Sequence, residues 1–196
     1  MGHAITSGGG FSKSFPVPDF QKNAIDNYFI QAKNANHTPV AGYAIGRGYP
    51  DISLAGHYYY TLLGGSWYLL SGTSASSPAV AGMFSTINAA RMAVGKGSLG
   101  WINPVLYANA SIFANDVISG HNKCSSNGLC CPHGFYAAPG WDPTTGIGSI
   151  NYGKLQEFLV RLGNVNGAYY APALRPKPNI EALSSSDSYS DGTANY

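Results

Sequence analysis

Ser74 is the residue of this chain whose type and position most directly suggest catalysis. It follows an apolar, strand-like segment at 66–70 and precedes a helical pattern that runs to about residue 94. At the start of a helix, unpaired backbone N–H groups point outward, and they can stabilise the negative charge of an oxyanion. Gly72 allows the sharp turn that such a junction needs. The alternative interpretation is a helix N-cap, which is the commonest use of serine at this position.

Two aspartates in the second half of the chain could supply oxygen ligands to a cation. Asp116 and Asp142 lie in segments rich in glycine and proline. A hard cation such as Ca²⁺ binds carboxylate and backbone carbonyl oxygens together, and a loop of this kind can supply both. The alternative is that Asp116 caps a turn and that Asp142, before Pro143, starts one. On the residues alone, the turn interpretation is favoured.

Three cysteines, Cys124, Cys130 and Cys131, lie within eight residues of one another. A disulfide from Cys124 to one of the adjacent pair would close a short loop and leave one thiol. His121 and His133 flank the cluster, so a zinc site is the alternative. The disulfide is favoured, because metal-ligand pairs usually come as regular C-x-x-C units.

The elements that position these residues follow from hydrophobic periodicity and turn signals. Apolar residues at helical spacing predict helices, and short apolar runs bounded by glycines predict strands. The expected helices lie near 20–32, 80–94 and 155–162, and the expected strands at 52–55, 58–63 and 66–70. Gly64-Gly65 between the last two strands predicts a hairpin.

Composition narrows the classes of function. The 196 residues are 44% hydrophobic and 10% charged, with a formal net charge of +2. So small a net charge, without Lys/Arg runs, argues against nucleic-acid binding. No apolar run is long enough to span a membrane, and no signal peptide is visible, so no membrane partner is expected. The chain becomes Pro-rich and then Ser-rich from about residue 172. We therefore expect a domain at 1–165 and a disordered tail at 166–196.

Four motifs, in the same order along the chain, resemble those of the sedolisin family of serine-carboxyl peptidases. SGTSASSP at 71–78 is similar to the nucleophile motif that sedolisins share with subtilisins. Three other segments resemble sedolisins: ITSGGGFS at 5–12, RGYPDIS at 47–53 and GWDPTTGIG at 140–148. Subtilisins lack the last of these. The resemblance covers about residues 5–163, and tripeptidyl-peptidase members look closest.

The resemblance implies an α/β fold, namely part of a subtilisin-like, doubly wound parallel sheet with flanking helices and a C-terminal calcium loop. Residues 1–165 would be the C-terminal part of the peptidase domain. Ser74 would be the nucleophile of a Ser-Glu-Asp triad. The Glu, the Asp and a further Asp that supports the oxyanion lie upstream of the segment that matches 5–12. None of the nine acidic residues occupies such a position. We therefore expect a fragment, with the N-terminal part of the domain as a candidate partner.

The sedolisin pattern also implies a calcium site. Its ligands here would be the carboxylates of Asp116 and Asp142 and the backbone carbonyls of Val117, Ala138 and Gly140. Such a mixture of carboxylate and carbonyl oxygens is typical of Ca²⁺ sites. The ion is expected to stabilise a loop-rich segment that has little core of its own.

The implied activity is that of an acid-acting serine peptidase, either a tripeptidyl-peptidase or an endopeptidase, with peptide or protein substrates and a lysosomal or secreted location. A carboxylate base suits cleavage at low pH. One alternative is a non-catalytic, calcium-stabilised peptide-binding module or a degenerate pseudopeptidase. Another is an ordinary subtilisin relative with His57 as the base, and the motif at 140–148 argues against it.

Overall fold

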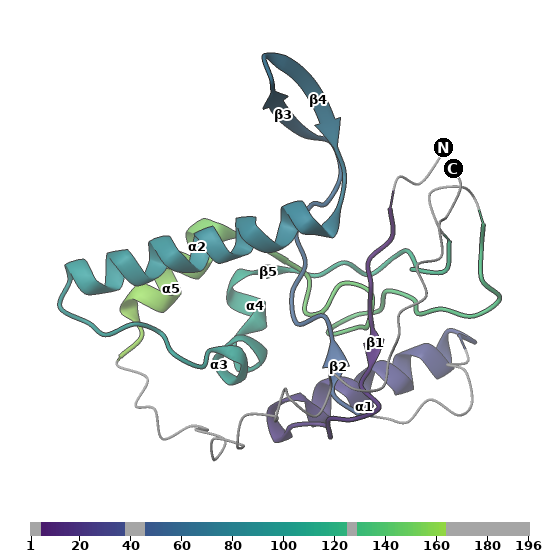
Figure 1. Ribbon diagram of the computed structural model, residues 1–196. Coiled ribbons are helices and arrows are strands. Elements are labelled where there is room, and N and C mark those ends of the chain that lie inside the picture. The colour runs from purple at the N-terminus through teal and green to yellow at the C-terminus, as the bar shows by residue number, and fades with distance from the viewer. Residues whose placement is uncertain (1–4, 38–45, 125–128, 164–196) are drawn as a thin grey trace, which may run out of the picture. The chain divides into compact units, whose positions relative to one another are not determined.

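Helices and short two-stranded ladders make up the described part of the chain, residues 5–37, 46–124 and 129–163 of this computed structural model (Figure 1). The helices are α1 (Asp19–Asn34), α2 (Thr73–Ala93), α3 (Asn103–Ala108), α4 (Ala110–Phe113) and α5 (Tyr152–Arg161). The strands are β1 (Gly10–Phe11), β2 (Gly48–Tyr49), β3 (Tyr59–Leu63), β4 (Ser66–Leu70), β5 (Ala114–Asn115) and β6 (Ser149–Ile150). The three predicted helices are confirmed as α1, α2 and α5. The expected disordered tail, 166–196, lies outside the described residues.

Each ladder among the described residues has two strands that run antiparallel: β1 with β2, β3 with β4, and β5 with β6. A parallel contact occurs at the isolated bridge between Ser53 and Ser149. The predicted strand at 52–55 is therefore reduced to this bridge. A parallel sheet needs neighbouring strands joined by long crossovers, and here the two segments meet at one residue pair. The doubly wound parallel sheet is not confirmed by the described residues.

The predicted hairpin is confirmed as β3 and β4. Its turn uses Gly64 at φ 58° and Gly65 at φ 82°, and two adjacent residues with positive φ form the type I′ turn that suits a two-residue hairpin loop. The register runs from Tyr59 opposite Leu70 to Leu63 opposite Ser66. Neither strand has a buried residue, so this hairpin exposes its apolar side chains on both faces.

An aromatic cluster fills the core between α1 and the segment at 140–148. The ring of Trp141 lies 5.9 Å from that of Phe11 and 6.0 Å from that of Tyr28, and Phe135 completes the cluster at 5.6 Å from Phe11. The indole N–H of Trp141 donates to the backbone oxygen of Pro50 at 2.9 Å. These rings are almost fully buried. The cluster ties the segment around Trp141 to the first helix and to β1.

A second part of the core joins α2 to α5, which lie side by side in Figure 1. Ile87 of α2 and Leu155 and Leu159 of α5 are fully buried. Of the apolar face predicted for the second helix, Ile87 is thus a core residue, whereas Val94 at its end is 60% exposed. None of the helices in the described ranges is long and apolar enough to cross a lipid bilayer.

The guanidinium of Arg91 holds the end of α5 from within this second core. Arg91 is fully buried and donates to the backbone oxygens of Leu159 and Leu162, at 2.5 and 2.9 Å, and of Gly163 at 3.2 Å. Its Nε donates to the oxygen of Gly97 at 2.9 Å. The last carbonyls of a helix lack partners within that helix and carry partial negative charge. A buried cation can therefore satisfy them, and here it does so for α5.

Candidate functional site

Ser74 is the second residue of α2, two residues beyond Gly72 and four beyond the end of β4. The predicted strand-to-helix junction is confirmed. Gly72 occupies the N-cap position, and the backbone N–H of Ala75 donates to its oxygen at 3.0 Å. Ser74 therefore lies inside the first helical turn and is not the cap, so the N-cap interpretation is wrong. Its side chain is exposed, as a nucleophile that must reach a substrate requires.

The hydroxyl of Ser74 has no hydrogen-bond partner among the residues that the structure describes. A serine nucleophile needs a base within hydrogen-bond reach to accept its proton. In the described residues, the ion-paired carboxylates contact basic side chains elsewhere, as in Lys22–Asp19, Arg47–Asp51 and Arg161–Glu157. The described part of the chain thus positions a serine without positioning its base.

His57, the base that a subtilisin-like interpretation would need, contacts a different serine. Its Nδ1 lies 2.5 Å from the hydroxyl oxygen of Ser71, and the backbone N–H of Tyr58 donates to the same oxygen at 3.3 Å. No hydrogen bond joins His57 to Ser74 in the described structure. The pairing of His57 with Ser71 was not predicted from the sequence, because 14 residues and the whole hairpin separate them.

The two predicted calcium carboxylates both contact the segment at 138–140. The backbone N–H of Gly140 donates to Oδ2 of Asp116 at 2.7 Å, and that of Ala138 donates to Oδ2 of Asp142 at 3.2 Å. Ala138 does not have a positive φ, which leaves its carbonyl in an ordinary backbone conformation. The fold therefore brings together four of the five predicted ligand residues. Val117 follows Asp116 directly and is half-buried.

Asp142 also has the turn role that was the alternative at this position. Its Oδ1 accepts hydrogen bonds from the backbone N–H groups of Thr144 and Thr145, both at 2.8 Å. The side chain is fully buried, and this burial raises the pKa of the Asp142 carboxyl, while the hydrogen bonds from Thr145, Ala138 and Thr144 oppose the shift. No ion pair to Asp142 occurs within the described ranges.

These contacts leave carboxylate oxygens of Asp116 and Asp142 able to bind a cation as well. Oδ2 of Asp142 accepts only the longer bonds, at 3.2 Å from Ala138 and from the hydroxyl of Thr145. Asp116 is exposed and uses one carboxylate oxygen towards Gly140. Asp116 and Gly140 line a hollow of about 710 Å³ beside α1 and α3, so an ion could reach them. The described residues contain no group of three or more His, Cys, Asp or Glu side chains that could hold a metal, so a site here would depend on carbonyl oxygens as well.

The cysteine prediction is confirmed, with the choice of partner resolved. Cys124 forms a disulfide with Cys130, and Cys131 is an exposed free thiol. The disulfide uses two of the three sulfur atoms that a zinc site would need. His121 instead stacks edge-on against Tyr136, with ring centroids 5.6 Å apart. The zinc alternative therefore lacks its ligands.

A polar network anchors the segment around Asp51, which lies within a motif that resembles sedolisins. Both carboxylate oxygens of Asp51 accept from Arg47, at 2.8 and 2.7 Å, and they also accept from Asn103 and Tyr107. Burial, followed by the negative charge of Asp51, raises the pKa of Tyr107. The hydroxyl of Tyr107 in turn contacts the buried amide of Gln21 at 2.7 Å. This network joins α1 and α3 to β2, so the role of Asp51 is structural.

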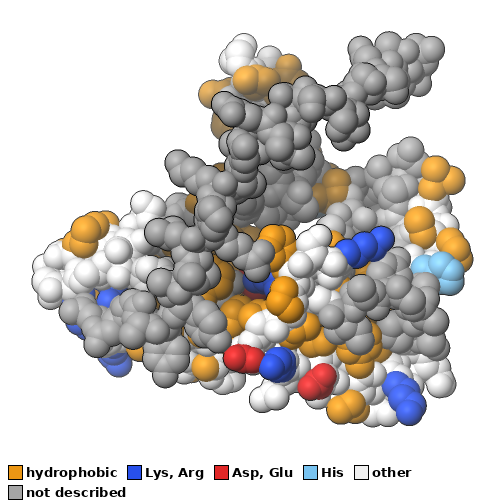
Figure 2. Space-filling model, turned by 60° about the horizontal axis from the view of Figure 1, so that its bottom comes forward, with side chains coloured by type: hydrophobic (Ala, Val, Ile, Leu, Met, Phe, Trp, Pro, Cys, Tyr) orange, Lys and Arg blue, Asp and Glu red, His pale blue; other side chains and the backbone are white. Residues whose placement is uncertain are grey.

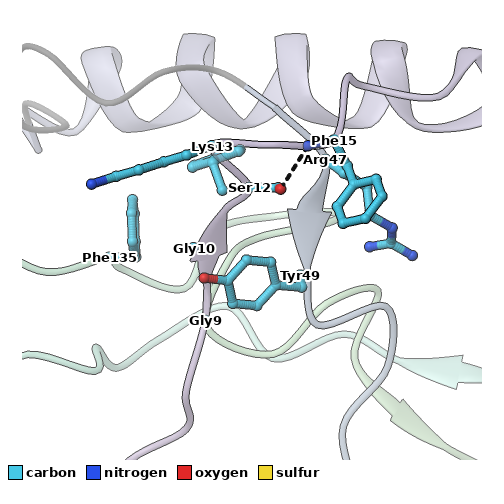
Figure 3. A pocket seen from close by; sticks show the side chains of 9 residues that line it. Gly9, Gly10, Ser12, Lys13, Phe15, Arg47, Tyr49 and Phe135 are labelled. Atoms are coloured by element: carbon cyan, nitrogen blue, oxygen red, sulfur yellow. Dashed lines mark hydrogen bonds between the residues drawn. The ribbon is translucent and has the colours of Figure 1, made fainter. Parts of the chain in front are cut away.

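A second hollow, of about 570 Å³, lies beside β1 and β2 (Figure 3). Tyr49 and Phe135 give it aromatic walls. Ser12, Lys13 and Arg47 also line it. Ser12 accepts from the N–H of Phe15 at 2.9 Å, and Arg47 pairs with Asp51. On the face drawn in Figure 2, basic and acidic side chains of the described residues are intermingled with apolar ones.

Comparisons with known proteins place these motifs in a family. The chain is 40% identical over 170 residues to Aorsin from Aspergillus oryzae, which covers 82% of this chain and 25% of Aorsin. It is 38% identical over 162 residues to tripeptidyl-peptidase SED1 from Arthroderma otae, covering 81% and 23%. With tripeptidyl-peptidase 1 from Rattus norvegicus it shares 37% identity over 159 residues, covering 79% and 27%. The chain thus spans about a quarter of the length of these curated relatives.

A solved structure agrees with these relatives. Pseudomonas sedolisin, a serine-carboxyl proteinase complexed with two molecules of pseudo-iodotyrostatin, matches with a TM-score of 0.56 and 25% identity over 77% of this chain and 36% of that chain. No protein-family model matches the chain. The chain belongs to the sedolisin family of serine peptidases. Within that family it is tripeptidyl-peptidase-like, as the names of its relatives indicate.

Proposed function

We propose that this chain carries the nucleophile Ser74 of a serine peptidase that cleaves peptide or protein substrates. The observation that most supports this is the position of Ser74, which is exposed in the first turn of a helix of 21 residues. The backbone N–H groups at such a helix start favour a developing oxyanion. Because the chain spans only about a quarter of its relatives, the activity of the whole protein is part of the proposal. The names of the relatives favour tripeptidyl-peptidase action, with endopeptidase action as the other form.

In the proposed reaction, the hydroxyl oxygen of Ser74 attacks the scissile carbonyl carbon and its proton passes to a carboxylate. The peptide leaves with that proton, and water then hydrolyses the acyl-serine ester and restores Ser74. Because Ser74 has no base among the described residues, we propose that residues outside them supply the carboxylate and its partners. A carboxylate base favours cleavage at low pH, which fits a lysosomal or secreted location.

We further propose that calcium binds the carboxylates of Asp116 and Asp142 with the carbonyls of Val117, Ala138 and Gly140. Support comes from the two carboxylates, which both contact the segment at 138–140, and from the buried carboxyl group of Asp142, which has no cationic partner in the described ranges. Bound calcium would neutralise these carboxylates and link the segment after β5 to the segment at 138–142. Its role would be structural, because no observation relates it to Ser74.

The second candidate function is a non-catalytic, calcium-stabilised peptide-binding module or pseudopeptidase. The observation that favours it is the same free hydroxyl, because a serine without a base is a poor nucleophile. Both candidates predict that the isolated chain does not turn over peptides. They differ once a carboxylate base is supplied from a relative.

The deciding experiment is therefore complementation. The chain is refolded alone and together with the part of Aorsin outside the aligned segment, and each sample is assayed with a peptide library at acidic pH. Peptidase activity that appears only in the mixture and disappears with Ser74→Ala supports the nucleophile. Ser77→Ala, an exposed serine of the same helix, is the matched control and should retain activity. A well-folded mixture without activity would favour the pseudopeptidase.

A further inference from the structure

The segment at 55–57 contacts the residues on both sides of Ser74. On the C-terminal side, the hydroxyl of Ser76 donates to the backbone oxygen of Ala55 at 3.0 Å. On the N-terminal side, the backbone N–H of Gly72 donates to the oxygen of Gly56 at 2.7 Å. Two consecutive residues of one segment thus bond to positions two before and two after the nucleophile.

A third contact comes from the side chain of His57. Its Nδ1 lies 2.5 Å from the hydroxyl oxygen of Ser71, whose oxygen also accepts the N–H of Tyr58 at 3.3 Å. Tyr58 has a φ of 59°, in the left-handed region that non-glycine residues rarely adopt, and the His57 and Tyr58 rings lie 3.5 Å apart. Unusual backbone of this kind persists only where surrounding contacts hold it. The turn at 57–58 is therefore held against Ser71.

Gly56 lies close to the side chains of Ser76 and Ile5, which leaves little room for a Cβ atom. A Cβ placed there would lie 3.0 Å from the hydroxyl oxygen of Ser76 and 3.3 Å from Cδ1 of Ile5. A larger residue would require the hydroxyl of Ser76, which bonds to Ala55, to shift by a few tenths of an ångström. The glycine thus allows the contacts that bracket Ser74.

We propose that residues 55–57 form a clamp that fixes the position of Ser74, with His57 as a positioning residue that acts through Ser71. The N-cap residue of α2 is Gly72, which has no side chain to cap the first turn. The side chain of Ser74 has no hydrogen-bond partner in the described structure. The hairpin that leads into the turn has no buried residue. The clamp therefore supplies the contacts that the nucleophile turn itself does not. This inference deepens the proposed function and rests on it for its importance to catalysis.

A thiol at position 74 can report this positioning without any catalysis. The reporter is Ser74→Cys in a Cys131→Ser background, which removes the exposed free thiol and keeps the Cys124–Cys130 disulfide. A thiol held at a helix N-terminus has a pKa below the value of about 8.5 of a free thiol. The measurement is the rate of alkylation by iodoacetamide as a function of pH, which gives the thiol pKa.

His57→Ala should raise that thiol pKa towards about 8.5 and slow alkylation at neutral pH about threefold or more. His57→Asn places an amide near the position of Nδ1 and should restore both values, because it can still bond to Ser71. His57→Gln extends its amide to the position of Nε2 and should not restore them. An unchanged thiol in His57→Ala would overturn the clamp. So would a raised pKa that His57→Asn fails to restore, because the charge of the imidazole would then be the cause.

Two further variants and a second measurement keep the test independent of any single variant. Ser76→Ala removes the bond to Ala55 and should raise the thiol pKa. Ser77→Ala should leave it unchanged, because the side chain of Ser77 has no hydrogen bond in the described ranges. In the chain with native Ser74, His57→Ala should accelerate amide hydrogen exchange at 71–77, and His57→Asn should not. Equal exchange in all variants would refute the clamp. Because neither readout needs turnover, an inactive peptidase in the complementation assay leaves this result unaffected.

Discussion

Residues 138–148 and residues 55–76 differ in how deeply the fold buries their side chains. In the first segment, Trp141 and Asp142 are 2% and 0% exposed, and the ring of Trp141 packs against Phe11 and Tyr28. In the second, Trp67 is 62% exposed, and the hairpin has no buried residue at all. The segment expected to depend on an ion is therefore packed into the core, and the segment that carries the nucleophile is held by a few hydrogen bonds.

This difference changes what calcium would do and what the nucleophile needs. The loop-rich segment that was expected to have little core of its own is buried in part, because Trp141 packs against Phe11 and Tyr28. Calcium would add to an already buried segment instead of replacing a core. The turn that carries Ser74 owes its position to residues 55–57, so small changes there should affect its geometry more than the stability of the fold.

The largest effect is expected at Trp141. Trp141→Ala removes a buried indole with aromatic neighbours and its hydrogen bond to Pro50, so the free energy of unfolding should fall by about 3–5 kcal/mol. Urea denaturation followed by circular dichroism measures the loss. A loss below about 1 kcal/mol, which is typical of surface substitutions, would contradict the buried position of this segment.

Replacement of Arg91 should cause the next largest loss in the free energy of unfolding. Arg91→Met keeps the length of the side chain but removes the Arg91 donor from the carbonyl of Leu159 and leaves that of Leu162 with the longer bond from Lys96. An unsatisfied buried group costs about 1–3 kcal/mol. Chemical denaturation should show a loss of about 3 kcal/mol. The control is Arg161→Met, whose exposed ion pair with Glu157 should contribute less than about 1 kcal/mol. Equal losses in the two variants would exclude a special role for the buried cation.

Calcium is expected to give a somewhat smaller stabilisation. If the ion binds the folded chain alone, a concentration one hundred times Kd adds about 2.7 kcal/mol, which thermal melts with and without a chelator would show. Asp116→Asn should reduce the increment, because that exposed carboxylate contacts Gly140 and few other groups. Identical melting curves in calcium and in chelator would remove the proposed site.

In the calcium-free chain, Asp142 should make the free energy of unfolding depend on pH. Burial raises the pKa of its carboxyl above the unfolded value, so the folded state binds the proton more tightly. Its contribution to stability is full below the unfolded pKa and is lost as pH rises through the raised folded pKa. Asp142→Asn should lack this dependence when unfolding is measured across that range in chelator. A wild-type contribution that grows as pH rises through this window would show that the pKa is lowered instead.

The smallest effect is expected in the hairpin. Trp67→Ala removes an exposed indole whose ring lies 5.1 Å from that of Tyr60, and the free energy of unfolding should change by less than about 1 kcal/mol. The measurement is the same urea titration as for Trp141. A loss comparable to that of Trp141→Ala would mean that the hairpin is packed in solution and that the two regions do not differ.

Much of the local structure could be predicted from the sequence. The spacing of Ile25, Tyr28 and Ala32 predicted α1, and Gly64-Gly65 predicted the hairpin turn, because both signals lie within a few residues. The strand predicted at 52–55 was wrong, since this apolar run meets a partner only at Ser53. An apolar run specifies a strand only where a neighbouring strand is present to pair with it.

The sequence by itself determined the family motifs and the junction that presents Ser74, and it favoured a disulfide at Cys124. Only the tertiary structure decided that Asp142 is buried, that Arg91 holds the end of α5 and that His57 pairs with Ser71. The physical reason is the sequence separation between the groups that interact. Periodicity and turn chemistry act between neighbours in the chain, whereas these three features depend on groups up to 72 residues apart that meet only when the core packs.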